Sequence, residues 1–167
     1  KRPKDEVNYL MGLLSMQVQA NISKFNKLDI RILFLGNKDG IPESAYKGLM
    51  KAVEATKNNT TLTVQLAINY GGWDEIARAI NKALSAGITS FTPETLLSFV
   101  DNPSVPLPDM IVRSAGEERL SGFMLLQSNY SEFGFYDDLW PDWNEAMVDR
   151  IVSDYQSRTR KYGGLVK

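Results

Sequence analysis

The sequence contains no cysteine and no histidine, and these two absences remove much of the usual chemistry of active sites. Without cysteine the chain has no disulfides, no thiolate nucleophile and no zinc-thiolate centre. Without histidine it lacks the most frequent general base and metal ligand. Within these 167 residues, chemistry is left to carboxylates, hydroxyls, arginines, lysines and backbone N–H groups.

Neither sign of charge is in excess, and no hydrophobic run is long. Nineteen basic residues stand against 20 acidic ones, for a formal charge of −1, so we expect no nucleic-acid partner. No apolar stretch approaches the ~20 residues that cross a bilayer. We therefore expect a soluble protein that binds any anion locally, built as a single domain over residues 1–167.

Apolar residues recur alternately with helical and strand spacing along the chain. Strands separated by helices indicate an α/β fold, with a mostly parallel central sheet flanked by helices. A capping-box spacing of Asp142 and Glu145 predicts the start of the last helix. The expected helices are residues 3–25, 41–58, 73–87, 92–100, 120–128 and 142–155, and the expected strands are residues 30–36, 61–69, 109–114 and 131–138.

Two strand ends carry the informative motifs, because ligands bind beyond the carboxyl ends of parallel strands. The first is residues 69–76, NYGGWDEI, in which paired glycines let the backbone approach a ligand. A tight strand-to-helix turn explains the same glycines, and local evidence favours that interpretation, since a glycine pair is a weak signal.

The second motif is residues 113–121, RSAGEERLS, directly after an apolar strand. Ser114 and Glu117 have capping-box spacing, which predicts a helix start there. Arg113, Arg119 and Ser121 suit a diphosphate, since guanidinium groups bind phosphate through two parallel hydrogen bonds. Purely structural roles are the alternative interpretation: Glu117 would then only cap a helix, and Ser121 would only donate a hydrogen bond to a nearby backbone carbonyl.

Glu132, in the sequence NYSEFGF, is the carboxylate best placed to hold a metal at the same sheet edge. Magnesium typically takes one or two carboxylates together with phosphate oxygens and water. A strand-end acid exposed to solvent is the competing interpretation. Trp140 and Trp143 are interpreted as packing residues.

The chain resembles the cis-prenyltransferases, the undecaprenyl diphosphate synthase group. The resemblance is carried by NYGG at residues 69–72, by RSAGEERLSGF followed by QSNYSE, by DDLWPD, and by RKYGG at residues 160–164. It extends upstream to KRPKDEV and so covers essentially the whole chain. It implies that an N-terminal part of the fold, with a magnesium-binding aspartate, is missing from this chain, and that the fragment alone is inactive.

The family resemblance implies a Mg2+-dependent transferase that extends an allylic diphosphate, such as farnesyl diphosphate, with isopentenyl diphosphate. The product is a polyprenyl diphosphate for lipid-carrier synthesis in the cell wall. Arg113, Arg119 and Ser121 match the residues that bind the isopentenyl diphosphate head, and Glu132 matches the magnesium-linked acid. Other positions that match the family's functional motifs are Arg2, Asn69, Glu117 and Gly163.

The resemblance further implies a homodimer in the cytoplasm, and a long lipid product is compatible with peripheral membrane contact. The main alternative is a non-catalytic accessory subunit of a heteromeric cis-prenyltransferase. Retention of Arg113, Glu117, Arg119, Ser121 and Glu132 argues against that alternative. Trp73 is a departure, because the family usually has arginine there.

Overall fold

The computed structural model of the chain describes residues 3–159 and confirms the alternation of helices and strands. The chain forms two compact units, Lys1–Pro103 and Ser104–Lys167, and its organisation as a single domain stays a prediction. The elements are α1 (Lys4–Ala20), α2 (Ile22–Lys27), β1 (Ile30–Leu35), α3 (Glu43–Ala55), β2 (Leu62–Ala67), α4 (Gly72–Ser85), α5 (Pro93–Leu97), β3 (Met110–Arg113), β4 (Glu132–Phe135), the 3-10 helix η1 (Trp140–Asp142) and α6 (Glu145–Ser157).

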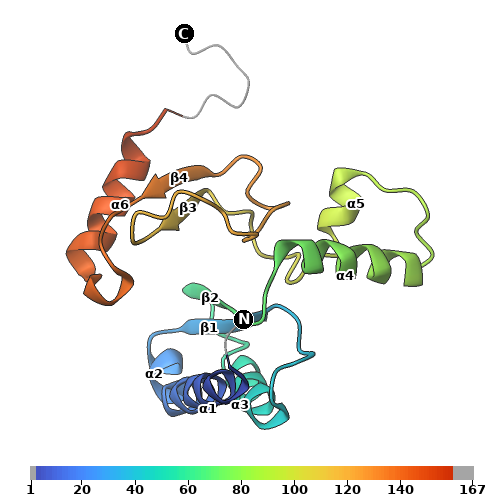
Figure 1. The fold of residues 1–167 in the computed structure, drawn as a ribbon, viewed down its shortest axis with the longest axis horizontal. Coiled ribbons are helices and arrows are strands. Elements are labelled where there is room, and N and C mark those ends of the chain that lie inside the picture. The colour runs from blue at the N-terminus through green and yellow to red at the C-terminus, as the bar shows by residue number, and fades with distance from the viewer. Residues whose placement is uncertain (1–2, 160–167) are drawn as a thin grey trace. The chain divides into compact units, whose positions relative to one another are not determined.

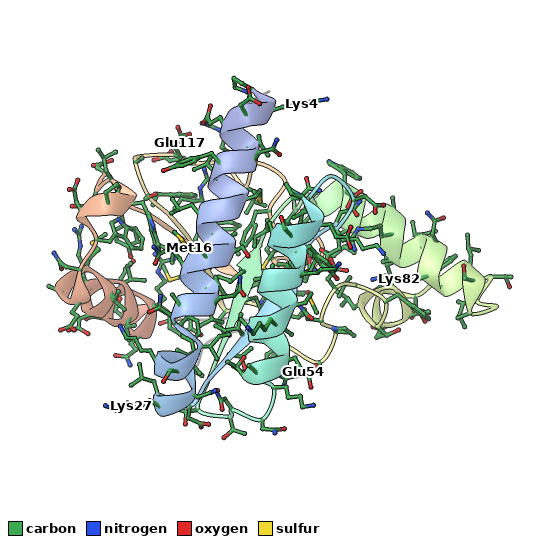
Figure 2. All side chains as sticks on the ribbon, turned by 90° about the horizontal axis from the view of Figure 1, so that it is seen from below. Lys4, Met16, Lys27, Glu54, Lys82 and Glu117 are labelled. Carbon is green, nitrogen blue, oxygen red and sulfur yellow. The ribbon has the colours of Figure 1, made fainter. Side chains whose placement is uncertain are left out.

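The first unit is built on a parallel pair of strands. β1 and β2 run in register from Ile30 opposite Leu62 to Leu35 opposite Ala67, so the predicted parallel pairing is confirmed. Both strands therefore end at the same edge. Helices α1, α2 and α3 lie on one face of this pair (Figure 1), and α1 and α3 run side by side there (Figure 2).

The core of this unit forms where the apolar stripes of α1 and α3 meet the strands. Val18, Leu49, Ala52 and Ile68 are buried at its centre. Gly48 brings the two helices close together, because a Cβ atom at this position would lie 2.0 Å from the Ser15 hydroxyl. Burial of these apolar side chains is the main stabilising contribution to the unit.

The single helix expected over residues 3–25 is divided in two. α1 ends at Ala20, and Asn21 is both its C-cap and the N-cap of α2. The Asn21 side chain donates to the main-chain carbonyl of Gln17 at 2.8 Å. Asparagine competes with the helical backbone for hydrogen bonds, which explains why the helix is interrupted here although its apolar spacing continues.

Helix α4 ends as the sequence predicts. Gly87, with φ of +83°, follows the C-cap, and its N–H donates to Leu84 O. Ile88 N donates to Ala83 O, which completes a Schellman motif.

The second unit contains another parallel pair, β3 and β4, with Met110 opposite Glu132 and Arg113 opposite Phe135. On this unit the sequence-based assignment is partly wrong. The expected helix over residues 120–128 is absent, because Ser121, Gly122 and Met124 have positive φ of 48°, 79° and 48°. A right-handed helix cannot pass through such residues.

The last helix forms, but its cap differs from the expectation. α6 begins at Glu145, and the side chain of Asn144 accepts a hydrogen bond from Met147 N. Asp142 lies in the preceding 3-10 helix and so does not cap α6. Over residues 3–159, no helix is both long enough and apolar enough to cross a membrane.

Candidate functional site

Asn69 and Asn37 connect the carboxyl ends of β1 and β2. The Asn69 amide donates to the main-chain carbonyls of Asn37 and Asp39 at 2.9 and 2.8 Å. Asn37 N in turn donates to Asn69 O at 3.2 Å. Asn69 has φ of +49°, a conformation that asparagine tolerates better than most residues. Its side chain thus fixes the loop that follows β1.

Asp101 joins the same loop to helix α4. Its Oδ2 accepts from Gly36 N at 3.2 Å, and its two oxygens accept from Arg78 Nη1 and Nη2 at 2.6 and 2.7 Å. Lys82 Nζ adds a contact of 3.1 Å to Oδ1. Because the Asp101 side chain is only 10% exposed, this bidentate pair is well shielded from water.

The positive charges around Asp101 favour its ionised form. Burial alone would raise the pKa of Asp101, but hydrogen bonds and charge from Arg78 and Lys82 outweigh it and lower that pKa. The hydrogen bond to Asp101 likewise raises the pKa of Arg78, against the effect of burial. The cluster is therefore an ion pair at neutral pH.

A pocket of about 600 Å³ opens beside these groups. Its lining carries both signs of charge and includes Lys38, Asp39, Tyr46, Arg78, Lys82 and Asp101. Glu75, which is 1% exposed, closes the same region by accepting from Tyr70 Oη at 2.5 Å and from Asp101 N at 3.0 Å. Asp101 was not predicted as a site residue, because its partners Arg78 and Gly36 lie 23 and 65 positions away in the sequence and only the fold brings them together.

Trp73 lies in the first turn of α4, directly after the glycine pair. Its side chain is 76% exposed, which is unusual for a large apolar residue. Gly71 is the N-cap of this helix, and Gly72 is buried. A tight turn into α4 therefore accounts for the backbone conformation at the glycine pair.

In the second unit, the loop after β3 brings together three of the predicted residues. The Arg113 guanidinium donates to the main-chain carbonyl of Arg119, and the Arg119 guanidinium forms an ion pair with Glu117. Arg113 and Glu117 are half-buried, whereas Arg119 and Ser121 are exposed. The two arginines thus belong to one compact loop, with Ser121 two residues beyond.

The predicted helix start at Ser114 is wrong. Ala115 and Gly116 have φ of 61° and 62°, and their N–H groups donate to Asp138 O and Tyr136 O, both at 3.0 Å. The loop is therefore held by the chain after β4 and not by a helical turn. Glu117 does not cap a helix, so its ion pair with Arg119 is its principal contact in the loop.

Glu132 opens β4 and forms an ion pair with Arg158. Glu132 Oε2 lies 3.2 Å from Arg158 Nη1, and the same guanidinium reaches Asp154 Oδ2 at 2.9 Å. Tyr136 Oη also donates to Asp154 Oδ2, at 2.8 Å. The competing interpretation of Glu132, as an acid exposed at a strand end, is thus incomplete, since its side chain is 33% exposed and paired.

The hydrogen bonds of this cluster shift the pKa values of Asp154 and Arg158 so that both groups stay charged. The hydrogen bond from Tyr136, followed by that from Arg158, lowers the pKa of Asp154. Bonds to Asp154 and then to Glu132 raise the pKa of Arg158. Arg158 was not predicted as a site residue, and its four-residue spacing from Asp154 on a helix was the one available signal.

The remaining predicted residues divide between the two units or lie outside the described part. Asn69 belongs to the first unit, while Arg113, Glu117, Arg119, Ser121 and Glu132 belong to the second. Arg2 and Gly163 lie outside the described residues.

Comparisons with known proteins identify the family. A family model described as putative undecaprenyl diphosphate synthase matches residues 1–163. An isoprenyl transferase of Neisseria gonorrhoeae is 36% identical over 163 residues, which cover 98% of this chain and 66% of the relative. The ditrans,polycis-undecaprenyl-diphosphate synthase ((2E,6E)-farnesyl-diphosphate specific) of Micrococcus luteus is 36% identical over 170 residues, covering 98% of this chain and 68% of the relative.

A solved structure agrees with these sequence matches. The lavandulyl diphosphate synthase of Lavandula x intermedia, in complex with dimethylallyl diphosphate, superposes with a TM-score of 0.90 at 28% identity. The match covers 98% of this chain and 73% of that one. The chain spans about two thirds of the length of the curated relatives that it matches. By the family model over residues 1–163 and by these relatives, the chain belongs to the undecaprenyl diphosphate synthase family of prenyltransferases.

Proposed function

We propose that the protein extends an allylic diphosphate, of the farnesyl diphosphate kind, with isopentenyl diphosphate to give a polyprenyl diphosphate with cis double bonds. Membership of the family and the names of its relatives support this reaction class. The observation that carries the proposal is the loop after β3, where Arg113 bonds to the main chain of Arg119. Two guanidinium groups in one loop suit a diphosphate.

In this proposal Arg113, Arg119 and the Ser121 hydroxyl bind the isopentenyl diphosphate head. Arg119 is exposed and carries its partner Glu117 beside it, so a diphosphate exchanges one anionic partner for another. Both the bond to Glu117 and the bonds to phosphate are charge-assisted, and a diphosphate favours the exchange because it offers the guanidinium more anionic oxygens than one carboxylate does. Glu117 then acts by holding the Arg119 side chain in place before the substrate arrives.

The reaction joins the terminal alkene carbon of isopentenyl diphosphate to the first carbon of the allylic chain. The carbon–oxygen bond to the allylic diphosphate breaks, that diphosphate leaves with the electron pair, and one proton is lost from the isopentenyl unit. Positive charge near the departing diphosphate lowers the barrier. As the family resemblance implies, Arg2, Asn69 and Gly163 also contribute to substrate binding in this proposal, and Asn69 acts through the main-chain carbonyls that it fixes.

Glu132 fits the magnesium role that the family implies. Its carboxylate gives oxygen ligands, and its ion pair with Arg158 engages Oε2. Within residues 3–159 no group of three or more His, Cys, Asp or Glu side chains could hold a metal ion, so the cation would depend on Glu132 together with phosphate oxygens and water. When bound, Mg2+ supplies positive charge that offsets the charge of the diphosphates.

We also propose that the protein works as a homodimer. Phe133 and Phe135 stack on one face of β4, with ring centroids 6.0 Å apart, and are 38% and 41% exposed. Exposed aromatic pairs on a short strand are typical of surfaces that a partner covers. Light scattering with size-exclusion chromatography tests this: a dimer is expected, and a monomer at micromolar concentration contradicts it.

Turnover tests the proposed function directly. Full-length protein, with any sequence that precedes residue 1, is incubated with farnesyl diphosphate, radiolabelled isopentenyl diphosphate and Mg2+, and the products are separated by chain length. Labelled polyprenyl diphosphate is expected. An accessory subunit would give no product alone but would raise the activity of an added catalytic partner, so that pattern contradicts the proposal.

A further inference from the structure

Arg158 connects the beginning of β4 to the end of α6. It is the C-cap residue of α6, and its guanidinium has three acceptors. Nη1 donates to Glu132 Oε2 at 3.2 Å and to Phe133 O at 2.7 Å, while Nη2 donates to Asp154 Oδ2 at 2.9 Å. The side chain is 26% exposed, so these bonds are partly shielded from water.

The arrangement requires the planar fork of arginine. One nitrogen serves the strand and the other serves the helix, and a lysine ammonium is a point charge that cannot match both directions. On the helix side, Tyr136 Oη donates to Asp154 Oδ2 at 2.8 Å and so holds the carboxylate that Arg158 contacts. Tyr136 is itself buried, at 7% exposure, and its ring packs edge-on against Trp143. The orientation of Arg158 is therefore imposed by the folded unit.

We propose that Arg158 is a positioning residue for Glu132: by holding Oε2 it would leave Oε1 available to a divalent cation. This inference rests on the proposed magnesium role of Glu132. Carboxylate ligands are usually oriented by hydrogen-bond partners behind them, and loss of such a partner costs about 10- to 100-fold in metal affinity. The Phe133 carbonyl and Asp154 supply the rigid frame for this contact.

Metal binding separates this role from a purely structural one. Mn2+ prefers the same oxygen ligands as Mg2+ and is visible by electron paramagnetic resonance. We would titrate the purified protein with Mn2+ in the presence of isopentenyl diphosphate. Arg158→Gln is expected to weaken Mn2+ binding about 10- to 100-fold. Arg158→Lys is expected to weaken it about tenfold, because it keeps the charge but loses the fork.

Two control variants distinguish positioning from general effects. Asp154→Asn weakens the frame on the helix side but leaves Glu132 paired with Arg158, so thermal stability should fall and Mn2+ affinity should fall by about threefold at most, less than in Arg158→Gln. Asp149→Asn changes an exposed residue of the same helix and should change neither quantity. Thermal melts of every variant establish that the titrations are made on folded protein.

The outcomes are distinct. Wild-type affinity for Mn2+ in folded Arg158→Gln, or an equal loss in Asp154→Asn, overturns the positioning role and leaves the proposed function standing. If wild-type protein and Glu132→Gln bind Mn2+ equally, or neither binds it, the metal role of Glu132 fails and the inference about Arg158 fails with it.

Discussion

The carboxylate of Asp101 accepts two hydrogen bonds from the guanidinium of Arg78, at 2.6 and 2.7 Å, across 23 residues of sequence. The pair joins helix α4 to the segment after α5, and Gly36 N adds the end of β1. Removing one partner of such a shielded pair destabilises the protein strongly, because the other charge is left buried without compensation.

Asp101→Asn should lower the free energy of unfolding by about 2 kcal/mol, because it leaves the partly buried Arg78 with Asp74, 2.8 Å from Nε, as its remaining acidic partner. The value lies below that for a fully buried pair, since the Arg78 side chain is 22% exposed. Urea unfolding measures the change. Glu43→Gln, which breaks an exposed ion pair with Lys47, is the matched control and should cost less than about 0.5 kcal/mol.

The contribution of Asp101 should depend on pH. Its folded pKa lies below the ordinary value of 3.8, so its stabilising effect is complete above that value and is lost as the pH falls through the folded pKa. The stability difference between wild type and Asp101→Asn should therefore be constant above about pH 5 and shrink as the pH falls below about 4. A difference that stays constant below about pH 4 as well would show that charge on Asp101 is not its source.

Gly36→Ala should destabilise the first unit by about 3 kcal/mol. Gly36 has φ of +135°, and a Cβ atom there would lie 2.2 Å from the main-chain oxygen of Ile68. Gly12→Ala is the control, since nothing lies within 4 Å of its Cβ position and the residue is inside α1. That substitution should stabilise by about 0.5–1 kcal/mol through helix propensity. Equal effects of the two changes would contradict the close approach at Gly36.

The sequence predicts those parts of the fold that depend on local spacing. The strand at residues 30–36 and the Gly87 terminus of α4 are confirmed, because apolar runs and a C-cap glycine are local signals. The helix expected over residues 120–128 is wrong, since Ser121 and Met124 adopt positive φ, which apolar spacing does not report.

For the candidate site, sequence patterns identify residues but not their partners. Arg113, Glu117 and Arg119 are close in sequence, so their association in one loop could be predicted from the sequence. Asp101 was missed because its partners come from distant segments that only the tertiary fold brings together, and Arg158 because Glu132 lies 26 residues away, although its other acidic partner, Asp154, is at local spacing. Long-range ion pairs of this kind leave no spacing pattern in a single sequence.

Asn69→Ala should cost about 1–2 kcal/mol of stability, because it removes two hydrogen bonds to main-chain carbonyls and leaves a non-glycine residue at φ of +49°. Asn69→Gly removes the same bonds without the backbone strain and should cost less. Thermal or urea unfolding of both variants measures the difference. If both fall within experimental error of wild type, the Asn69 amide does not hold the loop after β1.

The central claim is that the loop after β3 binds the diphosphate of isopentenyl diphosphate, and equilibrium binding of that compound by isothermal titration calorimetry tests it most directly. Arg119→Ala should weaken binding about 10- to 100-fold through loss of charge-assisted hydrogen bonds, whereas Arg150→Ala, an exposed arginine on α6, should leave it unchanged. Wild-type affinity in folded Arg119→Ala would contradict the account.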